Sequence, residues 1–211
     1  MKKTVIRTAL ITLGITILMA IAVFGIVSFC APSSMMNFTA SIGLESLSGD
    51  YAYQEYERSG DMDCLVRSFV IAAEKENDRT ANERFLVLYG EDESAERAAF
   101  EEYCNGYSVD SSAAGNVEIS MRSYVLGLEA CVKYRLAKTS DEKRTEACKT
   151  AIGWTDKSFP QGNPVVYLAI EAVENKDEKF CAMLLNEMSI AGFEENTDFN
   201  NILKLLEGDN A

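Results

Sequence analysis

The sequence contains no histidine, and it has only three prolines in 211 residues. Without histidine, the serine and cysteine catalytic centres that use an imidazole base are excluded. The six cysteines include no CxxC pair, so the usual zinc-binding spacings are absent as well. We therefore predict no catalytic residue, no cofactor site and no metal site.

The three prolines all stand near predicted helix boundaries, at Pro32, Pro160 and Pro164. Alanine, leucine, glutamate and lysine are abundant, and these residues favour helices. No alternation of apolar and polar residues is long enough to predict a strand. The sequence therefore predicts an all-α fold.

Charge is missing from one long stretch, the 24 residues from Thr8 to Ala31. A helix of this length reaches roughly 36 Å, which is enough to cross a hydrocarbon layer of about 30 Å. Lys2, Lys3 and Arg7 precede the stretch, and the next basic residue is Arg58. Because basic flanks stay on the cytoplasmic side, we predict that the N-terminus lies in the cytoplasm and the remainder outside.

This reading divides the chain into a cytoplasmic flank (1–7), a transmembrane signal anchor (8–31), a linker with a first helix (32–45) and an extracytoplasmic helical domain (46–208). A cleaved signal peptide and a lipoprotein are the alternatives. The apolar core is longer than the ~7–15 residues of a cleaved signal. The nearest cleavage candidate, Ser28-Phe29-Cys30, has a bulky residue before the cysteine. We therefore favour the uncleaved anchor.

The part after the apolar stretch is strongly acidic. It holds all 33 acidic residues but only 17 of the 20 basic ones, which gives a formal charge of −16. Such a surface repels nucleic-acid phosphates, so nucleic-acid binding is not expected. It weakly favours basic partners or divalent cations, and the commoner alternative is that the acidity serves only solubility.

The segment after the stretch predicts a helical hairpin. Residues 31–37 suggest a short linker, Phe38 to Leu47 the first helix, and Gly49-Asp50 a break. Tyr53 and Tyr56 share one face of a helix. Ser59-Gly60-Asp61 predicts its end and the start of a second helix, whose apolar face includes Leu65, Phe69 and Ala72.

These residues resemble a tetratricopeptide repeat over positions 46 to 79. Tyr56 stands four residues before Gly60, and Phe69 and Ala72 stand where the repeat has an aromatic and a small residue. The chain departs from the repeat at Gly49, where a large aromatic is usual, at Leu65, where a small residue is usual, and at Asn77, where proline is usual. The resemblance implies antiparallel hairpins stacked into a solenoid that binds proteins or peptides.

Further amphipathic helices are predicted over 80–89, 95–103, 117–138, 141–154, 165–175, 178–191 and 199–206. Together they suggest a solenoid-like array of antiparallel hairpins, with a non-repeating bundle as the alternative. Residues 107–115 read as a polar loop, either a plain connection or an inserted binding surface.

Cys131 and Cys148 lie at similar distances from the turn predicted near Thr139-Ser140. In an antiparallel hairpin, residues equidistant from the turn lie at the same height. We therefore expect the two thiols to be neighbours. A disulfide and a pair of buried free thiols both fit this placement.

Three functional classes follow from these patterns. The first is a membrane-anchored module that binds a protein or peptide through its helical domain. The second is a structural subunit of a membrane complex that uses the transmembrane helix for contacts, and the third is an enzyme with a non-standard site. The sequence favours the first.

Overall fold

A computed structural model describes the chain except residues 1, 91–93, 112–116, 138–139, 156–162 and 194–211. The described residues form ten helices and one two-stranded hairpin. This confirms the predicted helical class, with the hairpin as an exception. The chain forms two compact units, Met1–Cys64 and Leu65–Ala211, and each is described by itself.

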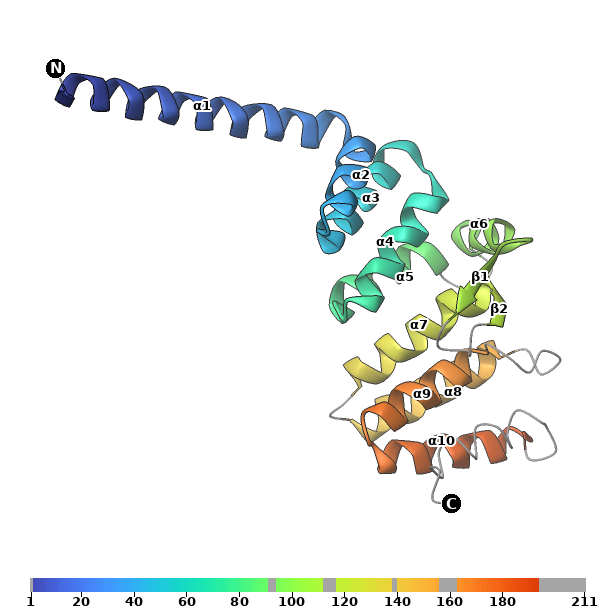
Figure 1. The fold of residues 1–211 in the computed structure, drawn as a ribbon. Coiled ribbons are helices and arrows are strands. Elements are labelled where there is room, and N and C mark those ends of the chain that lie inside the picture. Colours follow the sequence, from blue (N-terminus) through green and yellow to red (C-terminus); the bar gives the residue numbers. More distant parts are fainter. Residues whose placement is uncertain (1, 91–93, 112–116, 138–139, 156–162, 194–211) are drawn as a thin grey trace. The chain divides into compact units, whose positions relative to one another are not determined.

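The first unit begins with α1 (Lys2–Cys30), which is one uninterrupted helix (Figure 1). Its segment Ile11–Cys30 is long and apolar enough to cross a membrane, and none of it is buried within the fold. A signal sequence near an N-terminus can also be helical and apolar enough to meet this criterion. The structure thus contains a helix that fits the predicted anchor.

Two helices follow where the sequence suggests a linker and a break. Helix α2 (Pro32–Ser41) begins directly after Ala31, so the predicted linker over 31–37 is wrong. Proline suits a first helical position because its missing N–H has no partner there in any helix. Helix α3 (Glu45–Ser59) runs through Gly49 without a break. Glycine costs about 1 kcal/mol in a helix relative to alanine, and packing against α2 outweighs this cost.

Three polar contacts tie α3 to the end of α1 and the start of α2. The Tyr51 hydroxyl donates to Ser28 Oγ at 2.8 Å. Arg58 Nη1 donates to the carbonyl of Cys30 at 3.1 Å. The backbone N–H of Ser33 donates to Glu55 Oε2 at 3.2 Å. The buried carboxylate of Glu55 also pairs with Arg58 at 3.0 Å, so α3 and the α1–α2 junction form one connected structure.

The remaining helices lie in the second unit, except that α4 begins three residues before it. They are α4 (Met62–Glu74), α5 (Asp78–Tyr89), α6 (Ala95–Cys104), α7 (Met121–Leu136), α8 (Asp141–Trp154), α9 (Pro164–Glu174) and α10 (Glu178–Ile190). Helix α7 packs against α5, α8 and α9, and α10 packs against α8 and α9. The helix predicted over 199–206 lies outside the described residues.

Similar tight turns connect several consecutive helices. In Lys75–Asn77 and Asn175–Asp177 the middle residue is left-handed, with φ of 55° at Glu76 and 54° at Lys176. The last N–H of each turn returns to a carbonyl five residues earlier, at Ala72 (2.9 Å) and Ala172 (3.0 Å). This is the helix-ending pattern usually made with glycine. The same bond closes the turns centred on Gly43 and Gly192.

The core of the second unit has two main parts. One is an apolar cluster of α7 to α10, whose largest members include Tyr134, Leu168, Phe180 and Leu184. The other is a chain of aromatic rings: Phe85 lies 5.5 Å from Phe69 and 5.7 Å from Trp154 between ring centroids. It therefore joins α4, α5 and α8.

A nearly buried arginine connects four helices of this unit. Arg135 on α7 pairs with Asp78 of α5 at 2.6 Å and with Glu171 of α9 at 3.2 Å. Its Nη2 also donates to the carbonyl of Ala73 in α4 at 3.0 Å. An arginine fork satisfies several acceptors at once, which makes this burial tolerable.

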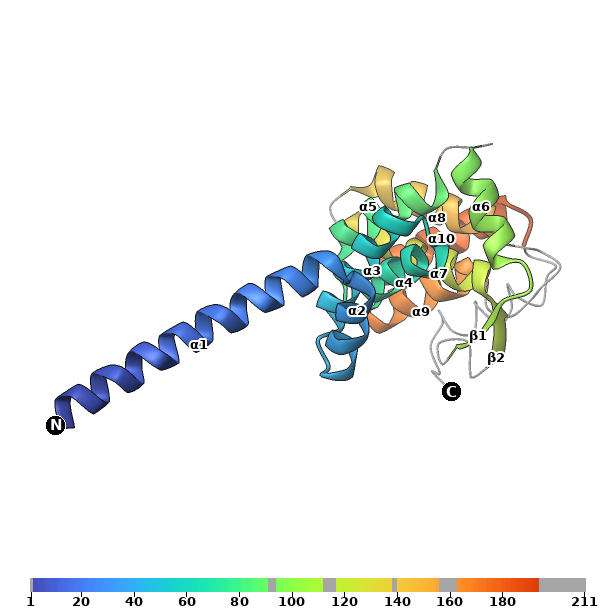
Figure 2. The same cartoon turned by 90° about the horizontal axis from the view of Figure 1, so that it is seen from above.

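The prediction that the chain has no strand is wrong. Strands β1 (Ser108–Ser111) and β2 (Val117–Ser120) pair antiparallel, with Val109 opposite Ile119. Both views show this hairpin beside α7 (Figures 1 and 2). Val109 and Ile119 pack in a small cluster with Cys131 of α7 and Tyr167 of α9. Four-residue strands carry too short an alternation to be distinguished from a loop by pattern alone.

Candidate functional site

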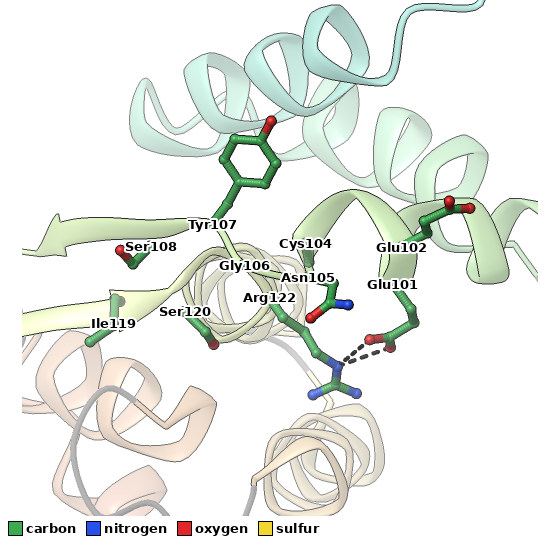
Figure 3. A pocket seen from close by; sticks show the side chains of 10 residues that line it. All are labelled: Glu101, Glu102, Cys104, Asn105, Gly106, Tyr107, Ser108, Ile119, Ser120 and Arg122. Atoms are coloured by element: carbon green, nitrogen blue, oxygen red, sulfur yellow. Dashed lines mark hydrogen bonds and ion pairs between the residues drawn. The ribbon is translucent and has the colours of Figure 1, made fainter.

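A hollow in the second unit lies between α6, the β-hairpin and the start of α7. Its volume is about 820 Å³. Figure 3 shows the ten residues that line it, from three consecutive parts of the chain. They are Glu101, Glu102, Cys104, Asn105, Gly106, Tyr107, Ser108, Ile119, Ser120 and Arg122.

Local backbone rules explain why these parts meet. Gly106 has φ of 84°, a left-handed conformation that lets the chain leave α6 and enter β1. The N–H of Met121 donates to the carbonyl of Tyr107 at 2.9 Å. This bond closes the end of the hairpin where the chain enters β1 and leaves β2. Ser120 then starts α7, because its side chain accepts from the N–H of Ser123 at 3.1 Å.

One ion pair crosses the pocket. Arg122 Nε donates to both carboxylate oxygens of Glu101, at 2.9 and 2.8 Å. Arg122 stands in the first turn of α7, where a cation meets the positive end of the helix dipole, and the carboxylate offsets this. The two Nη nitrogens point away from Glu101 (Figure 3). The Glu102 side chain points in another direction and is exposed.

The pocket also has an aromatic rim and a neutral thiol. Tyr107 is 58% exposed, and its ring stacks on Tyr103 at 5.4 Å with an interplanar angle of 12°. Cys104 is buried, and burial raises the pKa of its thiol to about 12, with Glu101 adding to the shift. The thiol is therefore protonated at neutral pH and is a poor nucleophile.

These side chains suit the binding of a polypeptide segment. Arg122 and the Asn105 amide offer donors, Glu101 and Glu102 offer acceptors, and the tyrosine pair offers an aromatic face. Such faces bind aliphatic, aromatic and cationic side chains. The hairpin contributes backbone edges, which extended peptides pair with in other proteins.

Sequence reasoning identified part of this region. It described 107–115 as a polar loop, either a plain connection or an inserted binding surface, and predicted the preceding helix over 95–103. It did not pair Glu101 with Arg122, which lie 21 residues apart in the chain. No local pattern carries that contact, because it depends on how α6 and α7 meet around the hairpin.

Glu129 of α7 is a buried carboxyl that the sequence pattern did not reveal. Its side chain has no exposed surface, and no described donor forms a hydrogen bond with either oxygen. Burial raises its pKa to about 8, although the Lys133 ammonium at 3.6 Å opposes the shift. Burial prevails because Lys133 is one-third exposed and solvent weakens its attraction. Glu129 is thus mainly protonated at neutral pH.

The residues of the helical hairpin predicted after the apolar stretch fall in both units of the structure. Gly60 ends α3 in a left-handed conformation with φ of 72°, as predicted. The rings of Tyr53 and Tyr56 lie 6.1 Å apart. Phe69 and Ala72 are buried in the second unit, where Phe69 contacts Phe85. In a helical hairpin Phe69 is expected to pack near Tyr53 and Tyr56; these residues belong to different units, and their contact stays a prediction.

Cys131 and Cys148 are both buried and free. Cys131 belongs to the small cluster under the β-hairpin, and Cys148 belongs to the large cluster of α7 to α10. Burial raises the pKa of both thiols, that of Cys148 to about 12. The expected contact between the two thiols stays a prediction.

A second hollow lies within the first unit, between α1 and α2. Its volume is about 690 Å³, and its walls are almost entirely apolar. Phe38 of α2 faces the α1 residues of this groove. Those residues are Thr16, Met19, Ala20, Val23, Phe24 and Val27.

Comparison with known proteins finds no matching family model, no matching curated protein and no matching solved structure. The likeness to a tetratricopeptide repeat therefore stays at the level of the local pattern. In the part of the chain that the structure describes, no group of three or more cysteine or acidic residues is placed to hold a metal ion.

Proposed function

We propose that this protein is a membrane-anchored interaction module. In this proposal α1 is an uncleaved anchor, the N-terminus faces the cytoplasm, and the helical domain outside binds a protein or peptide. The binding site is the pocket between α6 and the β-hairpin. A segment carrying a lysine or arginine is the favoured ligand.

The observation that carries the proposal is the chemistry of this pocket. It combines a stacked tyrosine pair, of which Tyr107 is exposed, with carboxylates and an arginine whose Nη nitrogens point away from its ion pair. Tyrosine and arginine are the residues most enriched where proteins bind one another. The acidic character of the domain adds a long-range attraction for basic partners.

The packing of α7 to α10 supports a solenoid-like arrangement for this module. Alternate helices pack together, α7 with α9 and α8 with α10, in addition to consecutive ones. Stacked hairpins produce this pattern because equivalent helices of neighbouring hairpins form one layer. The repeated left-handed turns at Glu76 and Lys176 also fit a hairpin used more than once.

Site-specific photo-crosslinking in intact cells tests this proposal. A benzophenone amino acid replaces Tyr107, and the matched control replaces Ile190, which is 72% exposed on α10. We expect a discrete adduct from position 107 that is absent from position 190. Adding Glu102→Lys should reduce the adduct if a basic segment is bound. Equal adducts from both positions, or none from position 107, would contradict the proposal.

The alternative is a structural subunit that makes its contacts through α1. It is favoured by the exposed apolar length of α1 and by the small residues Thr16 and Ala20 in its groove with α2. Replacing residues 8–31 with a leucine-only span separates the two functions. An interaction module keeps the position-107 adduct, whereas a subunit held by α1 loses its partners.

A further inference from the structure

Exposed apolar side chains are concentrated just after α1. Outside α1, the large apolar residues that are exposed include four within ten positions of one another: Phe38 (51%), Ile42 (53%), Leu44 (50%) and Leu47 (37%). Single exposed apolar residues are normal on a protein surface, whereas a group of them indicates a contact with a protein, a ligand or a membrane.

The same segment is free of charge. From Thr8 to Leu44 the sequence has no acidic or basic residue, and the first charge is Glu45 at the start of α3. Among the described helices, only α2 and the apolar part of α1 could therefore enter lipid without the cost of burying a charged side chain there. Part of the α2 surface is already occupied, because Met35 and Met36 are buried in a cluster with Tyr51 and Ala52 of α3.

The side of α2 that carries the exposed Phe38 lies against the apolar side of α1. The chain changes direction between α1 and α2 in both views, so that α2 runs across the direction of α1 (Figures 1 and 2). Phe38 lines the groove together with Val23, Phe24 and Val27. These three residues lie within about two turns of the end of α1.

This arrangement is held in place by polar contacts. The bonds from Tyr51 to Ser28 and from Arg58 to the Cys30 carbonyl connect α3 to the last turn of α1. Because α2 packs on α3, the side of α2 that carries Phe38 cannot turn away from α1 without breaking these two hydrogen bonds. Arg58 also sets a cation at the end of the apolar segment, where a phosphate headgroup would lie.

We propose that α2 and the α2–α3 turn lie in the outer interface of the lipid bilayer. Phe38, Ile42, Leu44 and Leu47 enter the boundary between headgroups and acyl chains, and acyl chains fill the groove between α1 and α2. Interfacial helices bury their apolar face about 5–10 Å deep in this way. The inference rests on the proposed membrane anchor. It adds that α2 and the α2–α3 turn are embedded in the interface and thereby fix how the chain leaves the bilayer.

Quenching of tryptophan fluorescence by brominated lipids tests this placement in the full chain. The native Trp154 is replaced by phenylalanine, and single tryptophans are introduced by Phe38→Trp, Leu44→Trp and, as a control on the exposed side of α3, Glu57→Trp. The proteins are reconstituted in phosphatidylcholine vesicles. We expect bromines near the headgroups to quench the tryptophans at 38 and 44 more than bromines near the chain ends, and neither to quench the tryptophan at 57.

A further variant, Val23→Trp, separates this inference from the anchor itself. Position 23 lies inside the apolar part of α1, so bromines near the chain ends should quench it most. If position 23 is quenched but positions 38 and 44 behave like position 57, α1 spans the membrane and the interfacial placement is wrong. If position 23 is not quenched by any lipid, the anchor is wrong and the placement fails with it.

Discussion

Gly127 shows how one missing side chain sets the distance between two helices. It lies inside α7, and a Cβ atom added there would meet Cδ2 of Tyr167 on α9 at 2.6 Å. Tyr167 is buried and packs with Cys131 and Ile119, so its ring has little room to move. The glycine is kept for close packing of α7 on α9, although it weakens the helix.

We predict that Gly127→Ala lowers the free energy of unfolding. Overpacking costs about 1–3 kcal/mol, and alanine returns about 1 kcal/mol of helix propensity. Gly153→Ala in α8 is the matched control, since a Cβ atom there meets nothing within 4 Å. The control should gain stability by up to about 1 kcal/mol. Thermal unfolding followed by circular dichroism measures both, and a stabilised Gly127→Ala would show that α9 does not press on this position.

Glu129 makes stability depend on pH. Its pKa is raised from an ordinary value of 4.5 to about 8 in the folded chain, so the folded state holds a proton that the unfolded state releases. Its contribution is therefore most favourable below about pH 4.5 and is lost as the pH rises towards about 8.

For Glu129→Gln, we predict a gain in stability relative to the parent that grows between about pH 5 and pH 8. The amide needs no proton on folding, so it avoids the cost of protonating the carboxylate of the unfolded chain, which reaches a few kcal/mol by linkage. Melting temperatures of variant and parent across this pH range give the difference. The exposed Glu83→Gln serves as control and should show no such trend. A constant difference for Glu129→Gln would mean that its carboxyl has an ordinary pKa.

At the scale of elements, the aromatic rings of α4, α5 and α8 hold separate helices together. Phe69 has no exposed surface and contacts Phe85, which in turn contacts Tyr89 at 5.1 Å and Trp154 at 5.7 Å between ring centroids. Removing one ring therefore disturbs contacts among three helices.

We expect Phe69→Ala to cost about 3–5 kcal/mol of unfolding free energy, because it leaves a cavity among rings that cannot collapse freely. Leu86→Ala is a suitable comparison, since Leu86 adjoins Phe85 on α5 but is 62% exposed. That change should cost less than about 0.5 kcal/mol. Denaturant unfolding of both variants provides the measurement. If Phe69→Ala melts like the parent, the ring cluster contributes little.

At the scale of the whole molecule, the junction after α1 bears on whether the anchor is retained. The candidate cleavage region Ser28–Cys30 is helical, and two of its groups accept hydrogen bonds from Tyr51 and Arg58. Cleavage there would remove acceptors that help to hold α3.

We therefore predict that the mature protein keeps α1. N-terminal sequencing of protein purified from membranes should find the residues that precede Thr8. Mass spectrometry of the intact protein gives an independent check. A mature chain beginning near Ala31 would instead identify residues 1–30 as a cleaved signal.

Several elements could be predicted from the sequence because their signals are local. The uncharged stretch Thr8–Ala31 predicts α1, and Gly60 correctly marks the end of α3. Apolar residues at helical spacing predict α9 and α10 to within about two residues. These features depend on residues within one or two turns of each other, so the chain order itself contains them.

Tertiary structure decided the rest. Helix α2, the continuity of α3 through Gly49, and the strands β1 and β2 all depend on partners that local propensity does not include. The pocket needs Glu101 and Arg122, and the buried fork of Arg135 needs Asp78 and Glu171 from two other helices. Sequence patterns indicate which residues tend to be buried and which tend to end a helix. Which distant side chains then meet depends on packing, where contacts are made across tens of residues and no local repeat records them.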